Sequence, residues 1–347
     1  MHLASRWDVP ACITACLQHL LTTLPQRLTA ADICKLMADG LPADVTSTQQ
    51  YAELVQRSKN SLLHLFGDVP AVITDEQLRA QFCALPWAAV KLWAAQDALV
   101  VDSENSVAVL LSCWWRQQHG KGGADSFTAQ QQEQSQELSK LLRVAQLTEV
   151  FRHDVLPQLP WFTSQDPIYK VLARRLSLSS SVKQWQSQVV SEYPPCWVGA
   201  ARVQQQQPAQ QEGALTRQQL AGILEGTGKE VCLFSVYASG FQWGMKTAKF
   251  SDGLWLGITP AAALGLYDVP PLILAEFTIH VRTAASVGFT PKKNWFDNLH
   301  PVQLRKVNGI NIKEVVPGVT APVMMSKCEP LFTNGSMPIK LTIDKVM

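Results

Sequence analysis

Residues 85–115, LPWAAVKLWAAQDALVVDSENSVAVLLSCWW, decide how the first half of the chain folds. Apolar residues recur at helical spacing before Asp97 and again after Ser103, which predicts two helices joined by a short connection. Ser103 stands where an N-cap belongs, and its hydroxyl can accept a hydrogen bond from a free amide of the first turn. Glu104 then places a negative charge at the positive end of the helix dipole.

The second of these helices is predicted to bury one continuous stripe. Val107, Leu110, Leu111 and Trp114 fall at i, i+3, i+4 and i+7, the spacing of a face that packs against a core. Trp115 lies about a hundred degrees further round the helix. We therefore expect Trp114 in the core and Trp115 half-exposed against a neighbouring helix.

The same stretch carries a family resemblance. Its pattern, LP-x3-V…S/Q-D-x-L-x-V-x-SE-x-x-V-x6-W, resembles the BACK domain, the helical module that follows a BTB domain in many ubiquitin-ligase adaptors. It is most similar to BTB-BACK proteins of plants and green algae, including the light-response BTB group. The pattern consists of packing and capping residues, so the resemblance implies a scaffold. Its members here are Leu85, Pro86, Val90, Asp97, Leu99, Val101, Ser103, Glu104, Val107 and Trp114.

The beginning of the chain extends this resemblance. Residues 7–24 predict a helix with Pro10 in its first turn, and V-P-A-C-I-x-A-C-x-x-x-L resembles the last helix of a BTB domain. Most of a BTB domain is then expected to lie outside this sequence. In BTB-BACK adaptors the helices near this point contribute to cullin binding. Further helices are predicted at 28–37, 47–66, 74–83, 138–151 and 166–175, with a polar loop at 120–134; Leu142-Arg143 resembles the L-[IL]-R segment of BACK domains.

From residue 230 the apolar period changes from 3.6 towards 2. Strands are predicted at 231–237, 241–245, 254–258, 272–283 and 339–346, with turns at Ser239-Gly240 and at 334–336. Several strands at short intervals without intervening helices predict an antiparallel β-sandwich. The glutamine-rich residues 204–211 cannot bury enough apolar surface to order themselves, and one short helix is expected at 215–224. The predicted class is α+β multidomain: 1–24 the last helix of a BTB-like domain, 25–180 a BACK-like helical bundle, 181–228 a linker, and 229–347 the sandwich.

The predicted sandwich carries a second resemblance. The order Y-x-x-G-[FY]-x-W…L-x-L-G…PP-x-x-x-A-E-F-T-I is similar to MATH/TRAF-like domains and covers about half of this segment. Residues 291–320 match nothing in that pattern. Trp243 and Trp255 are expected in the core. The matching residues are Tyr237, Gly240, Phe241, Trp243, Leu254, Leu256, Gly257, Pro270, Pro271 and 275–279.

Composition limits the function classes. The chain has 347 residues, of which 47% are hydrophobic and 17% charged, with a net charge of +2. This balance gives no electrostatic footprint for nucleic acid or an anionic membrane surface. The N-terminus lacks the apolar region of a signal peptide. Eight scattered cysteines without a CxxC motif are then expected to be reduced and buried, and the compartment to be cytoplasm or nucleus.

Two groups of residues could be interpreted as chemical sites. Cys12, Cys16 and His19 share one helical face, but a structural zinc site needs four ligands, so we expect these cysteines to pack in the core. His153-Asp154 invites a hydrolase interpretation, yet the sequence contains no G-x-S-x-G, P-loop, Rossmann or HExxH motif. No catalytic, metal or cofactor-binding residues are therefore predicted, and the chain is not expected to be an enzyme.

One stretch of the predicted sandwich is a candidate for partner binding. Lys292, Lys293, Trp295 and Phe296 combine charge with aromatic area in what we expect to be a loop. The alternative is that Trp295 and Phe296 fold back and seal the end of the sandwich. The resemblances imply a substrate-recruiting adaptor of a cullin-3-type ubiquitin ligase, which binds a cullin through the N-terminal helices and substrate through the sandwich. The alternative function is an interaction or structural protein without a ligase role.

Overall fold

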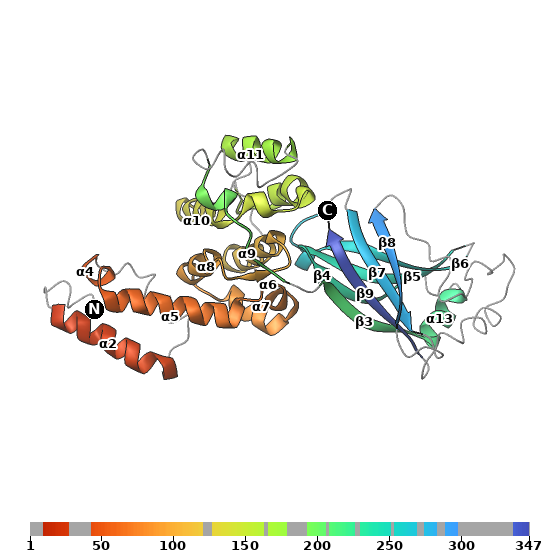
Figure 1. The fold of residues 1–347 in the computed structure, drawn as a ribbon, viewed down its shortest axis with the longest axis horizontal. Coiled ribbons are helices and arrows are strands. Elements are labelled where there is room, and N and C mark those ends of the chain that lie inside the picture. Colours follow the sequence, from red (N-terminus) through yellow and green to blue (C-terminus); the bar gives the residue numbers. More distant parts are fainter. Residues whose placement is uncertain are drawn as a thin grey trace. The chain divides into compact units, whose positions relative to one another are not determined.

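The computed structural model describes residues 10–27, 43–120, 127–162, 166–178, 193–205, 208–225, 230–250, 253–268, 274–282, 289–297 and 336–346. The fold is α+β, with helices and antiparallel sheets (Figure 1). It divides into two compact units. Unit 1 comprises residues 1–147 and 160–204, and unit 2 comprises 148–159 and 205–347. The helix predicted at 28–37 lies outside the described residues, and of the turn predicted at 334–336 only Ser336 is described.

Unit 1 opens with helix α2 (Pro10–Arg27), which packs along α5 (Gln49–Phe66). The short α4 (Ala43–Thr46) lies between them in the chain. Ile13 and Leu17 of α2 are buried with Val45, while Leu21 is buried with Leu54 of α5. Both helices were predicted, and Thr48 caps α5 by accepting from the backbone N–H of Tyr51 at 3.2 Å.

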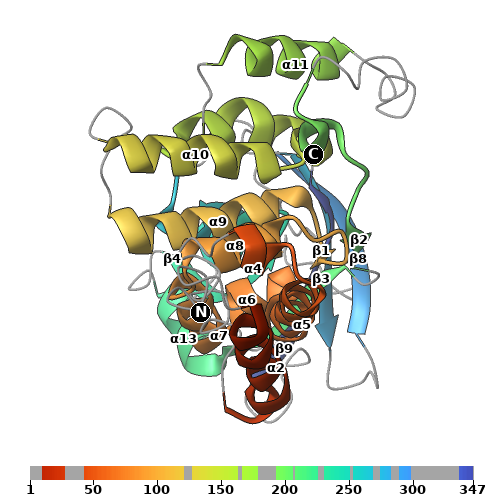
Figure 2. The same ribbon diagram turned by 90° about the vertical axis from the view of Figure 1, so that its left-hand side faces the viewer.

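Helix α9 is the centre of unit 1. Both views show it in the middle layer, with α10 on one side and the α5–α7 helices on the other (Figures 1 and 2). Its residues from Glu104 to Ser112 are all buried, because helices cover it on several sides rather than along one stripe. Helix α9 comprises Glu104–His119, and α6 (Val69–Thr74) and α7 (Glu76–Cys83) pack against it. Helix α8 (Trp87–Ala94) precedes it in the chain.

After α9 the structure differs from the sequence prediction. Helix α10 (Ala129–Leu141) begins inside the expected polar loop and ends ten residues before the expected helix end at 151. A capping box explains its early start, since Thr128 and Gln131 each bond the other's backbone N–H. The 3₁₀ turn η2 (Val144–Gln146) follows. Helix α11 (Pro167–Leu178) starts where predicted, with Asp166 accepting from Ile168 N at 2.8 Å.

Unit 2 contains two antiparallel sheets. The four-stranded sheet has the order β3-β9-β7-β8, and the three-stranded sheet has the order β4-β5-β6. All five predicted strands are present, and Ser239 and Gly240 form the predicted turn with φ of 50° and 87°. The strands are β3 (Ala209–Thr216), β4 (Glu230–Ala238), β5 (Phe241–Phe250), β6 (Gly253–Ala262), β7 (Leu274–Arg282), β8 (Phe289–Asp297) and β9 (Ser336–Val346).

The expected linker at 181–228 needs correction. Residues 209–216 form strand β3, which pairs along its whole length with β9. Helix α13 (Arg217–Leu224) follows, where a short helix was expected. Further upstream, β2 (Val203–Gln204) pairs in parallel with β1 (Val100–Val101) inside unit 1. These glutamines join a sheet through backbone hydrogen bonds, which need no apolar side chains.

A glycine of β3 permits a close approach between the two sheets. A Cβ atom built on Gly213 would lie 2.0 Å from a ring carbon of Phe234, which belongs to β4. The aromatic ring therefore occupies the space that any other residue at position 213 would need. Opposite Gly213 in β9 is the buried Ile339, so this contact lies on the buried face of the four-stranded sheet.

Three aromatic rings join the 148–159 segment to the rest of unit 2. Phe151, in a π-helical turn (Phe151–Val155), lies 6.1 Å from Phe241 and 5.8 Å from Tyr267 between ring centroids. The Tyr267 hydroxyl donates to the carbonyl of Gly240 and accepts from Ala263 N at 3.2 Å. This segment was expected to belong to the helical half. Within the described residues, no helix is both long and apolar enough to span a membrane.

Candidate functional site

The residues of the BACK-like pattern form one packed region of unit 1. Trp114 of α9 donates its indole N–H to the carbonyl of Leu85 at 2.8 Å, so the first and last members of the pattern are joined directly. The apolar members have at most 4% of their surface exposed: Leu85, Val90, Leu99, Val101, Val107 and Trp114. Pro86 is the N-cap residue of α8. The pattern therefore marks a hydrophobic core.

Ser103 does not cap α9 in the way we expected. It occupies the N-cap position, but its side chain makes no capping hydrogen bond, and its buried hydroxyl has no partner among the described residues. The carboxylate of Asp102, just before it, accepts from Ser103 N at 2.8 Å and from the hydroxyl of Ser106, neither of which is a backbone N–H of the first turn of α9. A carboxylate also suits the positive end of the helix better than a hydroxyl.

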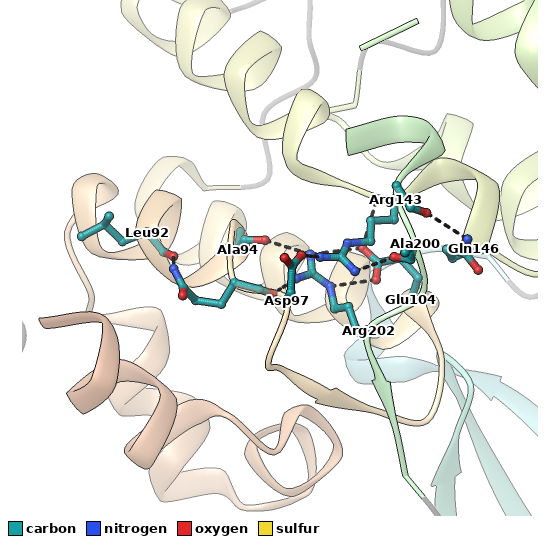
Figure 3. Close-up of polar contacts among 10 residues, drawn as sticks. Leu92, Ala94, Asp97, Glu104, Arg143, Gln146, Ala200 and Arg202 are labelled. Carbon is teal, nitrogen blue, oxygen red and sulfur yellow. Dashed lines mark hydrogen bonds and ion pairs between the residues drawn. The ribbon is translucent and has the colours of Figure 1, made fainter. Parts of the chain in front are cut away.

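Glu104 is the centre of a buried polar cluster (Figure 3). It lies in the first turn of α9, as expected. Its side chain is 1% exposed and pairs with Arg202, whose side chain is fully buried. Arg202 Nε donates to Glu104 Oε2 at 2.9 Å, and its Nη2 donates to Oε1 at 3.4 Å. Nη2 also donates to the carbonyl of Ala94 at 2.8 Å, and Nη1 donates to the carbonyl of Gln96.

Arg143 joins the same cluster from the segment after α10 (Figure 3). Its backbone N–H donates to Glu104 Oε1 at 3.0 Å. Its guanidinium donates to the carbonyl of Ala200 and pairs with Asp97, whose side chain is 92% exposed. Glu104 and Arg143 thus hold the chain at Ala200 and Arg202 against the start of α9.

Two opposing effects act on the Glu104 carboxyl group. Burial raises its pKa above the ordinary value, while the charges and hydrogen bonds of Arg202 and Arg143 lower it. Removing the arginine would therefore leave a carboxyl group that takes up a proton readily. Every donor of the Arg202 guanidinium named above faces a protein oxygen, so the arrangement serves to fix chain segments together.

The sequence indicated only part of this cluster. Asp97, Glu104 and Arg143 were singled out through the BACK resemblance, each for a local role. Arg202 was missed because it lies in the expected linker, 98 residues from Glu104. Its only local signal is a basic residue before the exposed two-residue strand β2, which is common on protein surfaces.

The tryptophan pair of α9 also differs from expectation. Trp114 is buried as predicted, but Trp115 is equally buried, with 1% of its surface exposed. The rings of His119 and Phe127 cover it at centroid distances of 4.2 and 5.2 Å. Unlike Trp114, Trp115 has no hydrogen-bond partner for its indole N–H among the described residues.

The N-terminal Cys12, Cys16 and His19 do not form part of a core. Cys12 and His19 are exposed and Cys16 is half-buried, so our expectation of buried cysteines is wrong here. Across the residues that the structure describes, no three His, Cys, Asp or Glu side chains come together as a metal site would require. Cys196 and Cys232 are exposed as well.

The four partner-binding candidates lie in a strand and not in a loop. Lys292, Lys293, Trp295 and Phe296 belong to β8, the outermost strand in the β3-β9-β7-β8 order. In register with β7, Trp295 is opposite Glu276 and Phe296 is opposite Ala275. An edge strand is a plausible place for recognition, but its geometry separates the two aromatic positions.

Strand alternation divides the four candidates between two faces. Directly opposed residues of an antiparallel pair share a face, and successive residues alternate. Lys292 is opposite Ile279, which is buried, and Phe296 has the same parity. Lys293 and Trp295 therefore occupy positions on the other face. The positions of Lys293 and Trp295 thus share one face and those of Lys292 and Phe296 the other, so the four do not lie on a single surface.

Comparison of the chain with protein-family models, with curated proteins and with solved structures gave no match.

Proposed function

We propose that the chain is a protein–protein interaction scaffold of the kind that recruits substrates to a cullin-3-type ubiquitin ligase. In this proposal unit 1 is a BACK-like helical bundle preceded by the last helix of a BTB-like domain, and unit 2 is a MATH/TRAF-like β-sandwich. Its place would be the cytoplasm or the nucleus. It would supply binding surfaces, while catalysis would belong to other subunits of the ligase.

One observation carries the proposal. The BACK-like pattern spans thirty positions of sequence, and its two ends meet through the hydrogen bond from Trp114 to Leu85. Its apolar members are buried together, and of its two charged members Glu104 is paired inside, while the exposed Asp97 pairs with Arg143. A pattern that specifies packing is what a scaffold needs, since its function is to hold separate binding surfaces in fixed positions.

In this proposal the cullin contacts helix α2. Its buried face packs against α5, while Thr14 and Gln18, one helical turn apart, are exposed. The test is binding of the full chain to the purified N-terminal domain of a cullin-3-type cullin, measured by biolayer interferometry. We expect micromolar affinity or better, and at least about a tenfold loss, equivalent to about 1.4 kcal/mol, in Thr14→Arg/Gln18→Arg.

A matched control separates contact from charge. Gln132→Arg/Gln136→Arg places the same two charges at the same spacing on the exposed face of α10, and it should leave cullin binding unchanged. A folded chain that shows no cullin binding would eliminate the ligase role. That result would leave the alternative of an interaction protein without one.

In this proposal substrate binds at strand β8, and the two faces of the strand are tested separately. Lys293→Ala/Trp295→Ala should reduce capture of a specific protein from lysate while the thermal unfolding of the chain barely changes. Lys292→Ala/Phe296→Ala, on the face shared with Ile279, should instead lower the melting temperature. If only the second variant affects capture, and only in proportion to lost folded protein, β8 is structural.

A further inference from the structure

Two cysteines of unit 1 are in direct contact. Cys83 is the last residue of α7, and Cys113 lies in α9, thirty residues further along the chain. The Cys83 thiol donates a hydrogen bond to Sγ of Cys113, with 3.3 Å between the sulfur atoms. Cys83 is buried and Cys113 is half-buried, so a small reagent reaches Cys113 first.

The surroundings divide the two thiols into an acid and a base. The hydrogen bond from Cys83 is the largest influence on Cys113 and, with the nearby charges of Arg116 and Arg79, lowers its pKa to about 7. The same hydrogen bond, together with burial, raises the pKa of Cys83. The thiolate is the reactive form of cysteine, so Cys113 is the nucleophile and Cys83 keeps its proton.

The backbone around the pair is held in place on both sides. The Gln118 side chain donates to the carbonyl of Cys83 at 2.8 Å, and Trp114 donates to the carbonyl of Leu85 at the same distance. Both bonds join α9 to the end of α7. The sulfur atoms therefore need only a small approach, to the bond length of about 2.05 Å in a disulfide, with no rearrangement of the helices.

We propose that Cys113 and Cys83 form a redox modification site at which a peroxide converts the thiol pair into a disulfide that joins α7 to α9. The Cys113 thiolate attacks one peroxide oxygen and the O–O bond breaks, giving a sulfenic acid and releasing hydroxide or alkoxide. The Cys83 sulfur then attacks the sulfenic sulfur, and its proton leaves with the hydroxyl group as water. The sulfur pair loses two electrons and the peroxide gains them.

This inference does not depend on the proposed scaffold function. The competing view is that the two thiols are ordinary core packing, since buried cysteines behave as small hydrophobes. Packing predicts that Cys113 reacts more slowly than the exposed Cys12, Cys196 and Cys232. The redox site predicts the reverse order, and these three cysteines serve as internal controls.

The test uses the full chain treated with hydrogen peroxide at pH 7, followed by alkylation of remaining thiols, trypsin digestion and mass spectrometry. Cys83 and Cys113 fall in separate tryptic peptides, residues 80–91 and 92–116. We expect a linked peptide two hydrogens lighter than the sum of the two. Free Cys113 should disappear at least about fivefold faster than free Cys12, because its lowered pKa makes a large fraction of it thiolate at pH 7.

Two variants separate the steps. Cys83→Ala should abolish the linked peptide and allow dimedone to trap a sulfenic acid at Cys113, while Cys113→Ser should leave Cys83 unoxidised. A measurement on the unmodified chain does not depend on either variant folding: the rate of Cys113 alkylation by iodoacetamide should rise with a midpoint near pH 7. Loss of Cys113 no faster than Cys12, or absence of the linked peptide, would overturn the proposal.

Discussion

Nε of Arg202 donates to the Glu104 carboxylate at 2.9 Å across 98 residues of sequence, and neither side chain has more than 1% of its surface exposed. Removing one partner of such a pair leaves a buried charge uncompensated, which costs about 3–5 kcal/mol. The two partners differ, however, in how they respond to isolation. A carboxyl group can take up a proton, whereas a guanidinium keeps its charge at every accessible pH.

This difference predicts a pH dependence for Arg202→Met. Burial raises the pKa of Glu104, and Arg202 is the main opposing influence, so the variant raises that pKa further. A group whose pKa is raised in the folded state contributes stability below its unfolded pKa, about 4.3, and loses it as the pH rises through the folded value. We therefore expect the stability deficit of Arg202→Met to grow as the pH rises above the folded pKa of Glu104 in the unmodified chain.

Urea unfolding followed by the helical circular dichroism signal at several pH values measures this trend. Glu104→Gln should be destabilised by a similar amount but with a deficit that is nearly constant over the same range, since the isolated Arg202 cannot lose its charge. The double variant Glu104→Gln/Arg202→Met should also lack the pH dependence. A constant deficit in Arg202→Met would mean that Glu104 remains ionised without its partner.

The two tryptophans of α9 predict a contrast between equal substitutions. Trp114 and Trp115 are equally buried, but only Trp114 has a hydrogen-bond partner, the carbonyl of Leu85. Trp114→Phe therefore loses ring volume and leaves that carbonyl unpaired, whereas Trp115→Phe loses volume but removes an unsatisfied N–H. We expect Trp114→Phe to be more destabilising by about 1–2 kcal/mol.

Urea melts of both single variants provide the comparison. Trp114→Ala gives the reference value for loss of the whole side chain. It should cost about 3–5 kcal/mol because of the cavity it leaves. Equal costs for the two phenylalanine variants would mean that the bond to Leu85 contributes nothing net. A larger cost for Trp115→Phe would show that its N–H has a partner outside the described residues.

The helices and most strands could be predicted from sequence because each has an apolar face with a regular period. Leu17 of α2 and Phe277 of β7 are buried at positions that the period identifies. Strand β3 had no such signal: in AQQEGALT only Leu215 is buried, and the strand is held by backbone hydrogen bonds to β9. Side-chain patterns do not report that kind of bonding.

The polar contacts were harder to predict from sequence than strand β3, for a different physical reason. Glu104 and Arg202 meet only after α8, α9 and the segment at 200–202 have come together, so neither residue carries a local signal of the other. The same holds for Cys83 and Cys113, which belong to different helices. Sequence reasoning located the core of unit 1 but not the ion pair or the thiol pair inside it.

Tyr267 provides a prediction for unit 2. Its hydroxyl donates to the Gly240 carbonyl beside the Ser239–Gly240 turn and accepts from Ala263 N, so Tyr267→Phe should cost about 1–2 kcal/mol. Burial raises the pKa of this phenol. Its contribution is therefore complete below the unfolded pKa of about 10 and declines above it.

The comparison of Tyr267→Phe with the unmodified chain thus has two parts. At pH 8 the variant should unfold at lower urea concentration, followed by the fluorescence of the buried Trp243 and its neighbours. Between pH 10 and 11 the difference should shrink, because only the unmodified chain has the Tyr267 phenol to ionise. A difference that stays the same at alkaline pH would assign the cost to packing of the ring instead of the hydroxyl.

The contact between Gly213 and Phe234 gives the sharpest test of how the sheets of unit 2 meet. A Cβ atom at position 213 would lie 2.0, 2.7 and 2.9 Å from three ring carbons of Phe234, which is closer than such atoms can approach. Gly213→Ala must therefore displace the ring or the strand, and overpacking of this kind costs about 1–3 kcal/mol. Strand β3 alone would favour alanine over glycine. A loss of stability in Gly213→Ala therefore indicates the contact with Phe234.

A double-mutant cycle isolates the contact. Phe234→Ala by itself should destabilise unit 2 by about 2–4 kcal/mol, since the ring is partly buried. In the Phe234→Ala background, Gly213→Ala should become neutral or stabilising, because the ring that it would meet is gone. The coupling energy should be at least about 1 kcal/mol. If Gly213→Ala has the same effect in both backgrounds, the Phe234 ring does not cover β3 at this position, and the two sheets meet elsewhere.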